Sequence, residues 1–285
     1  FGTQECWIGP ERMPLGTQVL ASGLSLTDLC GDEGLHGVQL AVPAPVGTQR
    51  QWLDKSAPDY KAELIRRLRL LRTTRYEFLG DTDFAVVETF VEENSEAFFV
   101  DGARPSRLRG FRFDILLSDD EPVTSKAFGA APDRRAEVTH HVEKQLELGN
   151  IVRGSSQYSS SGFTVKEAGK PHGRFVIDYR KLNRKTLRSH EPIPDIWDML
   201  RTLADGDRLT ALDLNQGFHQ LGLTERAQEK LAFVVPDGQF KWNTLPMGPC
   251  NGPPSFQAAM RTILARAAAR RGVAAIFIDD LAIRT

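Results

Sequence analysis

Two adjacent aspartates, Asp279 and Asp280, interrupt an apolar run that occupies residues 273–278 and 281–283. Charge inside an apolar segment is costly unless something compensates it. We therefore predict a strand, a tight turn that carries both acids, and a second strand. Two carboxylates held side by side at such a turn favour a divalent cation, because hard cations prefer oxygen ligands. A second doublet, Asp119-Asp120, lies in a polar turn and is interpreted as solvated.

A third acid, Asp213, ends a predicted buried strand over residues 209–214, and 66 positions separate it from Asp279. In an antiparallel sheet this strand end can lie beside the turn at Asp279-Asp280. Three carboxylates there could hold two divalent ions about 3.5–4 Å apart, the arrangement that clamps an in-line phosphoryl displacement. Without metal the acids would repel one another, and one or more would take up a proton. For Asp213 alone, an acid that caps a helix is the structural alternative.

The elements that must position these acids are hairpins and single helices without βαβ repeats, which favours an α+β fold with an antiparallel sheet. Hydrophobic periodicity and turn residues give the expected boundaries. We expect helices over residues 60–79, around 138–146 with an end at Gly149, and from Pro253 to Gly272. A strand or helix is expected around 84–90, and a strand over 112–117. Two hairpins should pair 162–166 with 174–179 and 231–235 with 239–243.

Composition limits the class of protein. The chain has 285 residues, of which 41% are hydrophobic and 26% charged, and it has no apolar stretch long enough to span a membrane. Cys6, Cys30 and Cys250 are too far apart for a disulfide framework or a zinc site, which favours a reducing, intracellular compartment. A secretory signal is not visible, and the missing initiator Met suggests a fragment.

Charge is distributed unevenly along the chain. Residues 1–150 carry 17 basic and 24 acidic groups, whereas residues 151–285 carry 19 basic and 13 acidic groups. Basic clustering of this kind is the footprint of a polyanion-binding face, and a solvated surface is the alternative. The same two interpretations apply to the arginines of the predicted 60–79 helix. The basic cluster of the second half comprises Lys166, Lys170, Arg174, Arg180, Lys181, Arg184, Lys185 and Arg188.

Four sequence blocks resemble the motifs of reverse transcriptases, in the order and at the spacing of that family. RFVIDYRKLN at 174–183 resembles R-x-x-x-D-Y-R-x-L-N, and ALDLNQGFHQ at 211–220 resembles D-L-x-x-G-Y/F-H-Q. LPMGPCNGPPSFQ at 245–257 is similar to L-P-F-G-L-x-N-A-P-x-x-F-Q, and FIDD at 277–280 to Y/F-x-D-D. The variant is that of gypsy-type LTR retrotransposons, and the resemblance covers roughly residues 103–285.

The resemblance implies a role for each matching residue. Asp213, Asp279 and Asp280 match the catalytic acids that bind two Mg²⁺ ions, with Mn²⁺ as an alternative, and the carbonyl of Leu214 matches a further metal ligand. Phe218 matches the aromatic gate that excludes a ribose 2′-hydroxyl. The matching nucleotide-binding residues are Lys166, Arg174, Gln216, Gly217, Phe218 and Met247, and the template-binding residues are Asp178, Arg180 and Gly248. Pro249 and Gly252 depart from the family's usual Leu and Ala.

We therefore expect fingers and palm of an RNA-directed DNA polymerase. Residues 1–102 form an unassigned N-terminal region, 103–150 a linker and entry helix, and 151–285 the truncated fingers and palm, without thumb. The expected partners are an RNA/DNA template-primer and a dNTP, with no membrane; the parent's thumb and ribonuclease H regions are missing, so activity would be weak or absent. The expected location is intracellular, a cytoplasmic particle or the nucleus. One alternative is a degenerate element that binds nucleic acid without catalysis, and another is a different two-metal enzyme, such as a nucleotide cyclase or nuclease.

Overall fold

The computed structural model describes residues 52–75, 80–100, 102–129, 131–167, 173–204, 209–271 and 273–284. Most of the unassigned N-terminal region, including Cys6 and Cys30, therefore lies outside the described residues. The same is true of Gly272, which was expected to end a helix, and of the turn at 168–172 in the first predicted hairpin.

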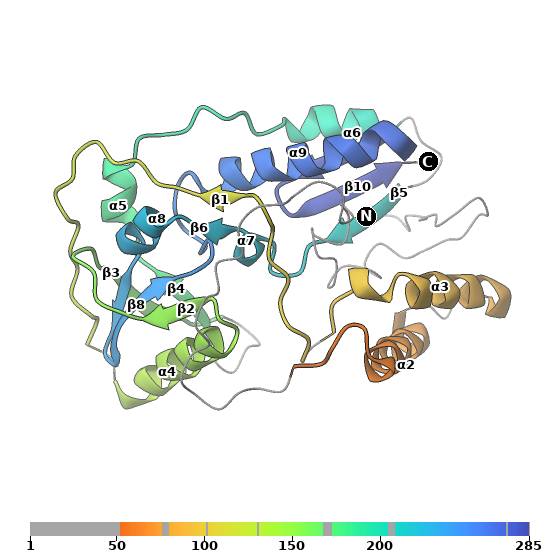
Figure 1. Cartoon of the computed structure of the whole chain (residues 1–285), viewed down its shortest axis with the longest axis horizontal. Coiled ribbons are helices and arrows are strands. Elements are labelled where there is room, and N and C mark those ends of the chain that lie inside the picture. The colour runs from red at the N-terminus through yellow and green to blue at the C-terminus, as the bar shows by residue number, and fades with distance from the viewer. Residues whose placement is uncertain are drawn as a thin grey trace.

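A three-stranded antiparallel sheet carries the acids. Its strands are β5 (Leu209–Asp213), β9 (Val273–Phe277) and β10 (Asp280–Arg284), in the order β5-β10-β9. The helices α9 (Gly252–Arg271) and α6 (Ile196–Ala204) pack against β9 (Figure 1). The predicted strand, tight turn and strand are confirmed, but the turn carries only Asp279, because Asp280 is the first residue of β10.

A five-stranded sheet forms the other large part of the structure, in the order β2-β8-β7-β3-β4. The helix α4 (Pro132–Glu147) packs against it, and His141 of α4 stacks on Phe175 of β4 with ring centroids 5.9 Å apart. Both predicted hairpins are present in this sheet. The strands are β2 (Ile151–Arg153), β3 (Ser160–Val165), β4 (Arg174–Ile177), β7 (Phe233–Val235) and β8 (Gly238–Trp242).

The sequence had suggested antiparallel sheets, but one pairing in the five-stranded sheet is parallel. β3 pairs with β7 in parallel, and residues 166–232 link these two strands. The strand predicted over residues 112–117 is wrong in length. Only β1 (Arg112–Phe113) forms a ladder, in parallel with β6 (Gly222–Leu223), and Leu117 makes an isolated antiparallel bridge with Thr186. Between them, the carboxylate of Asp114 accepts hydrogen bonds from Thr224 and Arg226.

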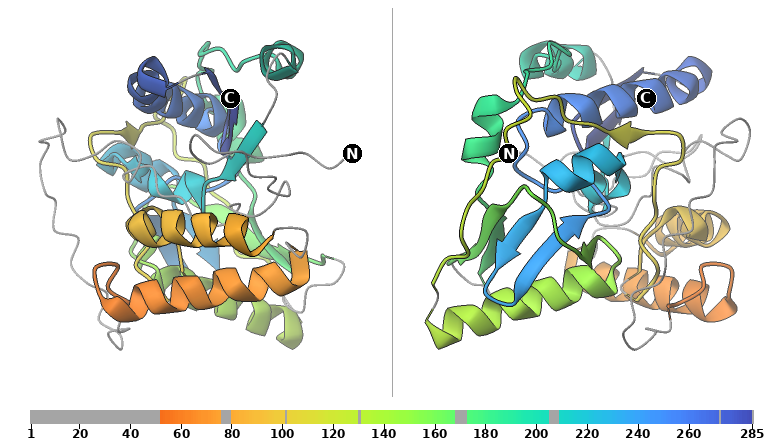
Figure 2. Two further views of the ribbon diagram at one scale, coloured as in Figure 1. Left: turned by 90° about the vertical axis from the view of Figure 1, so that its right-hand side faces the viewer. Right: turned by 60° about the vertical axis from the view of Figure 1, so that its left-hand side comes forward.

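A second, smaller hydrophobic core lies between α2 (Pro58–Arg75) and α3 (Asp81–Glu93), which run side by side in Figure 2 and are followed by the short helix η1 (Ser95–Ala97). The arginines of α2 are engaged in ion pairs: Arg69 with Glu88 at 2.5 Å and Arg72 with Asp81 at 2.6 Å. Local pairing neutralises much of this basic face, which favours the surface-helix interpretation over a nucleic-acid arm.

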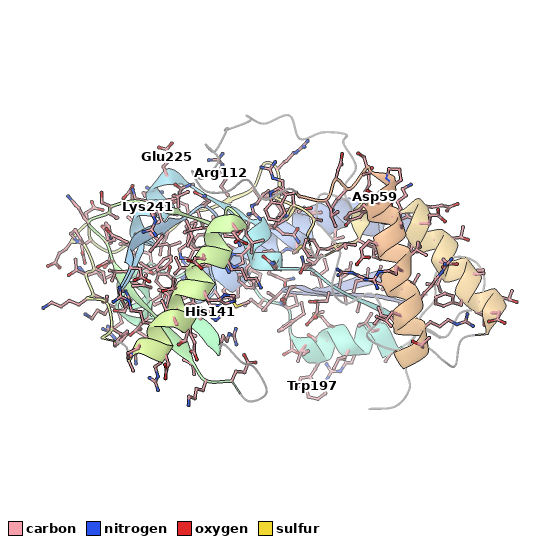
Figure 3. All side chains as sticks on the ribbon, turned by 90° about the horizontal axis from the view of Figure 1, so that it is seen from below. Asp59, Arg112, His141, Trp197, Glu225 and Lys241 are labelled. Atoms are coloured by element: carbon pink, nitrogen blue, oxygen red, sulfur yellow. The ribbon has the colours of Figure 1, made fainter. Side chains whose placement is uncertain are left out.

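Three short helices were not predicted, namely α5 (Arg180–Lys185), α7 (Gly217–Gln220) and α8 (Glu225–Lys230). Each has one or two turns, which is too short for a periodic pattern to appear. On α6, the side chain of Trp197 is 65% exposed and lies at the surface in Figure 3. Within the part of the chain that the structure describes, no helix has the length and apolar character needed to cross a bilayer.

Candidate active site

Backbone pairing brings the three aspartates together. In the β5–β10 ladder Asp213 stands directly opposite Asp280, so their side chains share one face of the sheet. Asp279 lies in the two-residue turn between β9 and β10. The N–H of Leu214, which follows β5, donates to the carbonyl of Asp279 at 3.2 Å. The strand end and the turn are therefore joined by main-chain hydrogen bonds on both sides of the acids.

The negative charges at this strand end oppose one another. Burial raises the pKa of Asp213 to about 6, and the charges of Asp279 and Asp280 add to the effect. Burial and the charge of Asp279 also raise the pKa of Asp280. An excess of carboxylate charge of this kind is what a divalent cation relieves, and oxygen is the donor type that Mg²⁺ prefers.

The acids do not form a preassembled metal cluster. Among the described residues, no three His, Cys, Asp or Glu side chains converge closely enough to hold an ion. Three carboxylates and a main-chain carbonyl are oxygen donors, the type that a divalent cation prefers.

The turn after β5 is tightly packed against the turn that carries Asp279. Gln216 adopts a left-handed conformation with φ 49°, and the N–H of Gly217 donates to the carbonyl of Leu214 at 3.1 Å. A Cβ on Gly217 would lie 3.3 Å from the Cβ of Asp279 and 3.1 Å from the ring of Phe256. Glycine is therefore needed for close approach. The Leu214 carbonyl, which was predicted to bind metal, therefore accepts a hydrogen bond from the Gly217 N–H, which was predicted to bind phosphate.

The predicted nucleotide-binding side chains come from three elements. Phe218 on α7 stacks on Phe256 of α9, with ring centroids 5.1 Å apart and planes at 13°. Met247 is 57% exposed in the loop before α9, and its sulfur accepts a hydrogen bond from the guanidinium of Arg174 at 3.2 Å. Lys166 is exposed at the end of β3, one position beyond the pair that Val165 forms with Arg174. The structure thus brings Arg174 and Met247 into contact, with Lys166 beside them on the hairpin.

The predicted template-binding residues are engaged locally. Arg180 donates two hydrogen bonds of 2.8 Å to the carboxylate of Asp178, which lowers the pKa of Asp178 to about 2. The Arg180 side chain is 81% exposed. Gly248 has φ +113°, and a Cβ there would lie 3.1 Å from the ring of Tyr179. Gly248 therefore sits where neither the backbone conformation nor the space suits another residue.

Three buried or loop amides with positioning roles were missed by the sequence analysis, although all lie inside the motif blocks. The side chain of Asn183 donates to the carbonyl of Gly248 and accepts from the N–H of Cys250, both at 2.9 Å. Asn251 donates to the carbonyl of Leu187 at 2.8 Å. Gln257 on α9 binds the main chain of Ile276 and Ile278, immediately before Asp279. Their spacing within the motifs was a signal, but spacing does not reveal that a side chain binds main chain.

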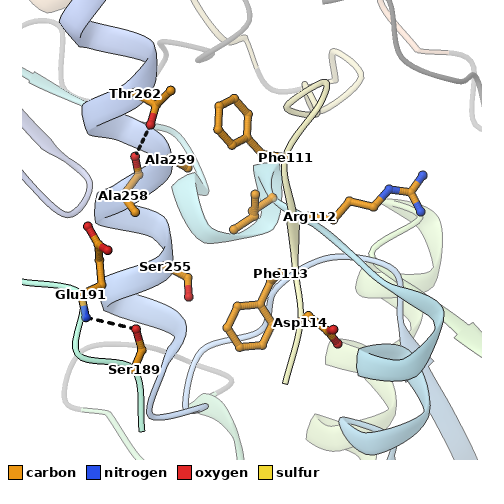
Figure 4. Close-up of a pocket in the computed structure, with 11 residues that line it drawn as sticks. Phe111, Arg112, Phe113, Asp114, Ser189, Glu191, Ser255, Ala258, Ala259 and Thr262 are labelled. Atoms are coloured by element: carbon orange, nitrogen blue, oxygen red, sulfur yellow. Dashed lines mark hydrogen bonds between the residues drawn. The ribbon is translucent and has the colours of Figure 1, made fainter. Parts of the chain in front are cut away.

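The pocket in Figure 4 is separate from these groups. It has a volume of about 270 Å³ and lies between the β1 segment and α9, where Phe111 and Phe113 face Ala258 and Thr262. None of the predicted site residues lines it. The chemistry suggested by the acids therefore belongs to the open strand end and not to this pocket.

Comparisons with known proteins agree with this arrangement. Residues 165–285 match the family model described as reverse transcriptase (RNA-dependent DNA polymerase). The Pol polyprotein of the Drosophila melanogaster transposon gypsy is 34% identical over 174 residues, which is 59% of this chain and 17% of the relative. The corresponding polyprotein of transposon opus is 32% identical over 172 residues, with the same coverage. This chain therefore spans less than a fifth of the length of these relatives.

Solved structures show the same fold. The foamy viral protease-reverse transcriptase in complex with an RNA/DNA hybrid superimposes with a TM-score of 0.64 at 19% identity, covering 82% of this chain and 30% of that one. The predicted α+β fold of polymerase fingers and palm is confirmed by this likeness. Residues 165–285 therefore carry a reverse transcriptase domain similar to those of LTR retrotransposons.

Proposed function

We propose that this domain adds deoxynucleotides to a primer 3′-hydroxyl on an RNA/DNA template-primer, by two-metal nucleotidyl transfer. The observation that carries the proposal is the ladder pairing of Asp213 with Asp280 beside the Asp279 turn. Asp213, Asp279 and Asp280 would hold the ions, with the carbonyl of Leu214 as a further ligand. When bound, Mg²⁺ would lower the pKa of the primer hydroxyl and offset charge on the α-phosphate.

The chain's own residues would position the incoming nucleotide. Arg174 already contacts Met247, so the basic β3–β4 hairpin (the fingers) meets the loop before α9 (the palm) at one point. Arg174 and Lys166 would bind the triphosphate there, since guanidinium and ammonium groups bind phosphate strongly. The main-chain N–H groups of Gln216 and Gly217 would complete the contact, which requires Gly217 to leave Leu214.

The sugar and template contacts follow from the same surfaces. Phe218 is held flat against Phe256, which gives its ring a fixed position from which to exclude a 2′-hydroxyl. Met247 would pack beside the sugar. Gly248 would allow the template base pair to approach the backbone, while Asp178 and Arg180 would lie along the template strand. An RNA/DNA hybrid is bound by the foamy viral relative, and it is the substrate that we propose here.

Single-turnover primer extension tests the proposal on this chain. A self-priming hairpin substrate keeps the primer end paired, and excess protein compensates for weak binding. We expect slow addition of one complementary dNMP that requires Mg²⁺ or Mn²⁺ and that disappears in Asp279→Asn. Extension that survives Asp279→Asn would contradict the assigned mechanism. Asp119→Asn is the matched control, because its carboxylate lies in a polar turn bonded to Lys185.

A catalytically inactive nucleic-acid binder is the second candidate, and one observation favours it. The N–H of Gly217, which is proposed to contact phosphate, already donates to the carbonyl of Leu214 at 3.1 Å. This candidate predicts binding of RNA or DNA that weakens steeply with salt, with no metal-dependent extension. Binding without turnover in the single-turnover assay would favour it over the polymerase.

A further inference from the structure

The turn that carries Asp279 contains an unusual backbone conformation. Ile278 has φ +57°, in the left-handed region. A β-branched residue rarely adopts this conformation, because its Cβ substituents crowd the backbone. The turn lies between Phe277 and Asp280, so the direction of Asp279 depends on the dihedral angles of Ile278. Something outside the turn must hold this residue in place.

The side chain of Gln257 holds the turn from α9. Its Oε1 accepts a hydrogen bond from the N–H of Ile278 at 2.6 Å, and its Nε2 donates to the carbonyl of Ile276 at 3.0 Å. Gln257 is 2% exposed. The amide supplies an acceptor and a donor at these two positions at once, whereas an ionised carboxylate could only accept. The two bonds therefore fix the orientation of the Gln257 amide.

The preceding residue on α9 supports the facing turn. Phe256 is fully buried, and its ring lies 3.1 Å from the position of a Cβ on Gly217. That position is in turn 3.3 Å from the Cβ of Asp279. Two consecutive helix residues thus contact the two turns that carry or flank the acids. Helix α9 acts as a rigid support for both.

We propose that Gln257 is a positioning residue, which holds Ile278 in its left-handed conformation and so keeps Asp279 directed toward Asp213. This inference rests on the proposed nucleotidyl transfer. The two hydrogen bonds of Gln257 go to the main chain of Ile276 and Ile278, so its loss should alter metal binding and the chemical step. Affinity for the nucleotide, which depends on Arg174 and Phe218, should stay the same.

Gln257→Leu tests the proposal, with Gln239→Leu as the matched control. Gln239 also binds main chain through its amide, accepting from the N–H of Ser156 at 3.0 Å and donating to the carbonyl of Tyr158 at 2.8 Å. For Gln257→Leu we expect kcat to fall about 10- to 100-fold, since misplacement of a reacting group by 1 Å has that effect. The half-saturating Mg²⁺ concentration should rise, and KM for the dNTP should stay within about threefold. An equal loss in Gln239→Leu would overturn the proposal, because it would show a purely structural effect.

A second substitution separates positioning from packing. Glycine adopts positive φ without cost, so Ile278→Gly removes the conformational strain that Gln257 restrains. Activity of the double variant Gln257→Leu/Ile278→Gly should therefore exceed that of Gln257→Leu, a non-additive result. Additive losses would contradict the proposal.

Hydrogen exchange tests the contact without catalysis. In the wild-type protein the amide of Ile278 should be protected from exchange, and in Gln257→Leu it should exchange at least about tenfold faster, as expected for an exposed amide. Gln239→Leu should leave this amide unchanged. If the wild-type chain shows no extension, the proposed function fails, while faster exchange of the Ile278 amide in Gln257→Leu still supports the positioning role of Gln257. Exchange that is identical in wild type and Gln257→Leu would refute that role.

Discussion

Replacing Asp213 with Asn should stabilise the metal-free protein while abolishing extension. In the folded chain the pKa of Asp213 rises from 3.8 to about 6 through burial and the charges of Asp279 and Asp280. A difference of this size corresponds to about 3 kcal/mol against the ionised form. Solvent screening at a partly exposed carboxyl reduces the expected gain to about 1 kcal/mol. Asn removes the charge and keeps the shape of the side chain.

The sign of the pH dependence follows from the raised pKa. Folded Asp213 binds its proton more tightly than the unfolded chain does, so ionisation destabilises the fold. The loss of folding free energy from ionised Asp213 is absent below pH 3.8, grows between pH 3.8 and about 6, and is complete above about 6. The advantage of Asp213→Asn should therefore be present at pH 7 and disappear at pH 4.

Thermal unfolding in EDTA measures this effect. At pH 7 we expect the Tm of Asp213→Asn to rise by about 2–4 °C, the shift that 1 kcal/mol produces in a chain of this size. Asp237→Asn is the control of opposite sign, because Thr139 and Arg135 lower the pKa of Asp237 and its removal should reduce Tm. An unchanged or lower Tm for Asp213→Asn in EDTA would refute the charge-repulsion reasoning. Mg²⁺ should raise the Tm of the wild type more than that of the variant.

Three further outcomes follow from the site. Gly248→Ala should destabilise the fold by about 1–3 kcal/mol in urea unfolding, because φ is +113° and the ring of Tyr179 lies 3.1 Å from the new Cβ. The control is Gly222→Ala, where a Cβ meets no atom within 4 Å. It should change the free energy of unfolding by less than about 1 kcal/mol. Phe218→Ala should raise ribonucleotide incorporation relative to deoxynucleotide at least about tenfold in competition assays, since a 2′-hydroxyl would no longer clash; unchanged discrimination would contradict the gate. Asn183→Ala should lose the 2.9 Å bonds to Gly248 and Cys250 and destabilise by about 1–3 kcal/mol, with no loss meaning that the loop is held by other contacts.

Sequence patterns predicted the parts of the fold that have strong local signals. The hairpin at Pro236-Asp237-Gly238 and the turn before Asp280 were predicted because polar residues separate apolar runs, although the turn itself comprises Ile278 and Asp279. The convergence of Asp213 with Asp280 was predicted from strand ends and from the motif, and the register confirms that they are opposite. Position in a strand pattern was therefore enough to locate the acids.

The parts that could not be predicted depend on tertiary contacts. Residues 112–117 read as a strand by composition, yet the ladder with β6 has only two residues, and Asp114 binds Arg226, 112 positions away in the sequence. The parallel pairing of β3 with β7 has no local signature, since the two strands are linked by a long connection. The role of Gln257 was hidden for the same reason: a glutamine in a helix pattern does not reveal that its amide binds a turn 21 positions later.

The central place of β10 also bears on how the chain acquires its structure. β10 lies between β5 and β9, and in the described structure each of these pairs only with β10. The β9–β10 hairpin is local and can form quickly, whereas β5 must wait for a partner that begins 67 positions after β5 ends. Until then β5 is an unpaired, mostly apolar edge of the kind that promotes aggregation. We therefore expect the acids to be assembled when β5 docks on β10, so that slow or misdirected docking of this strand would affect soluble yield and active site together.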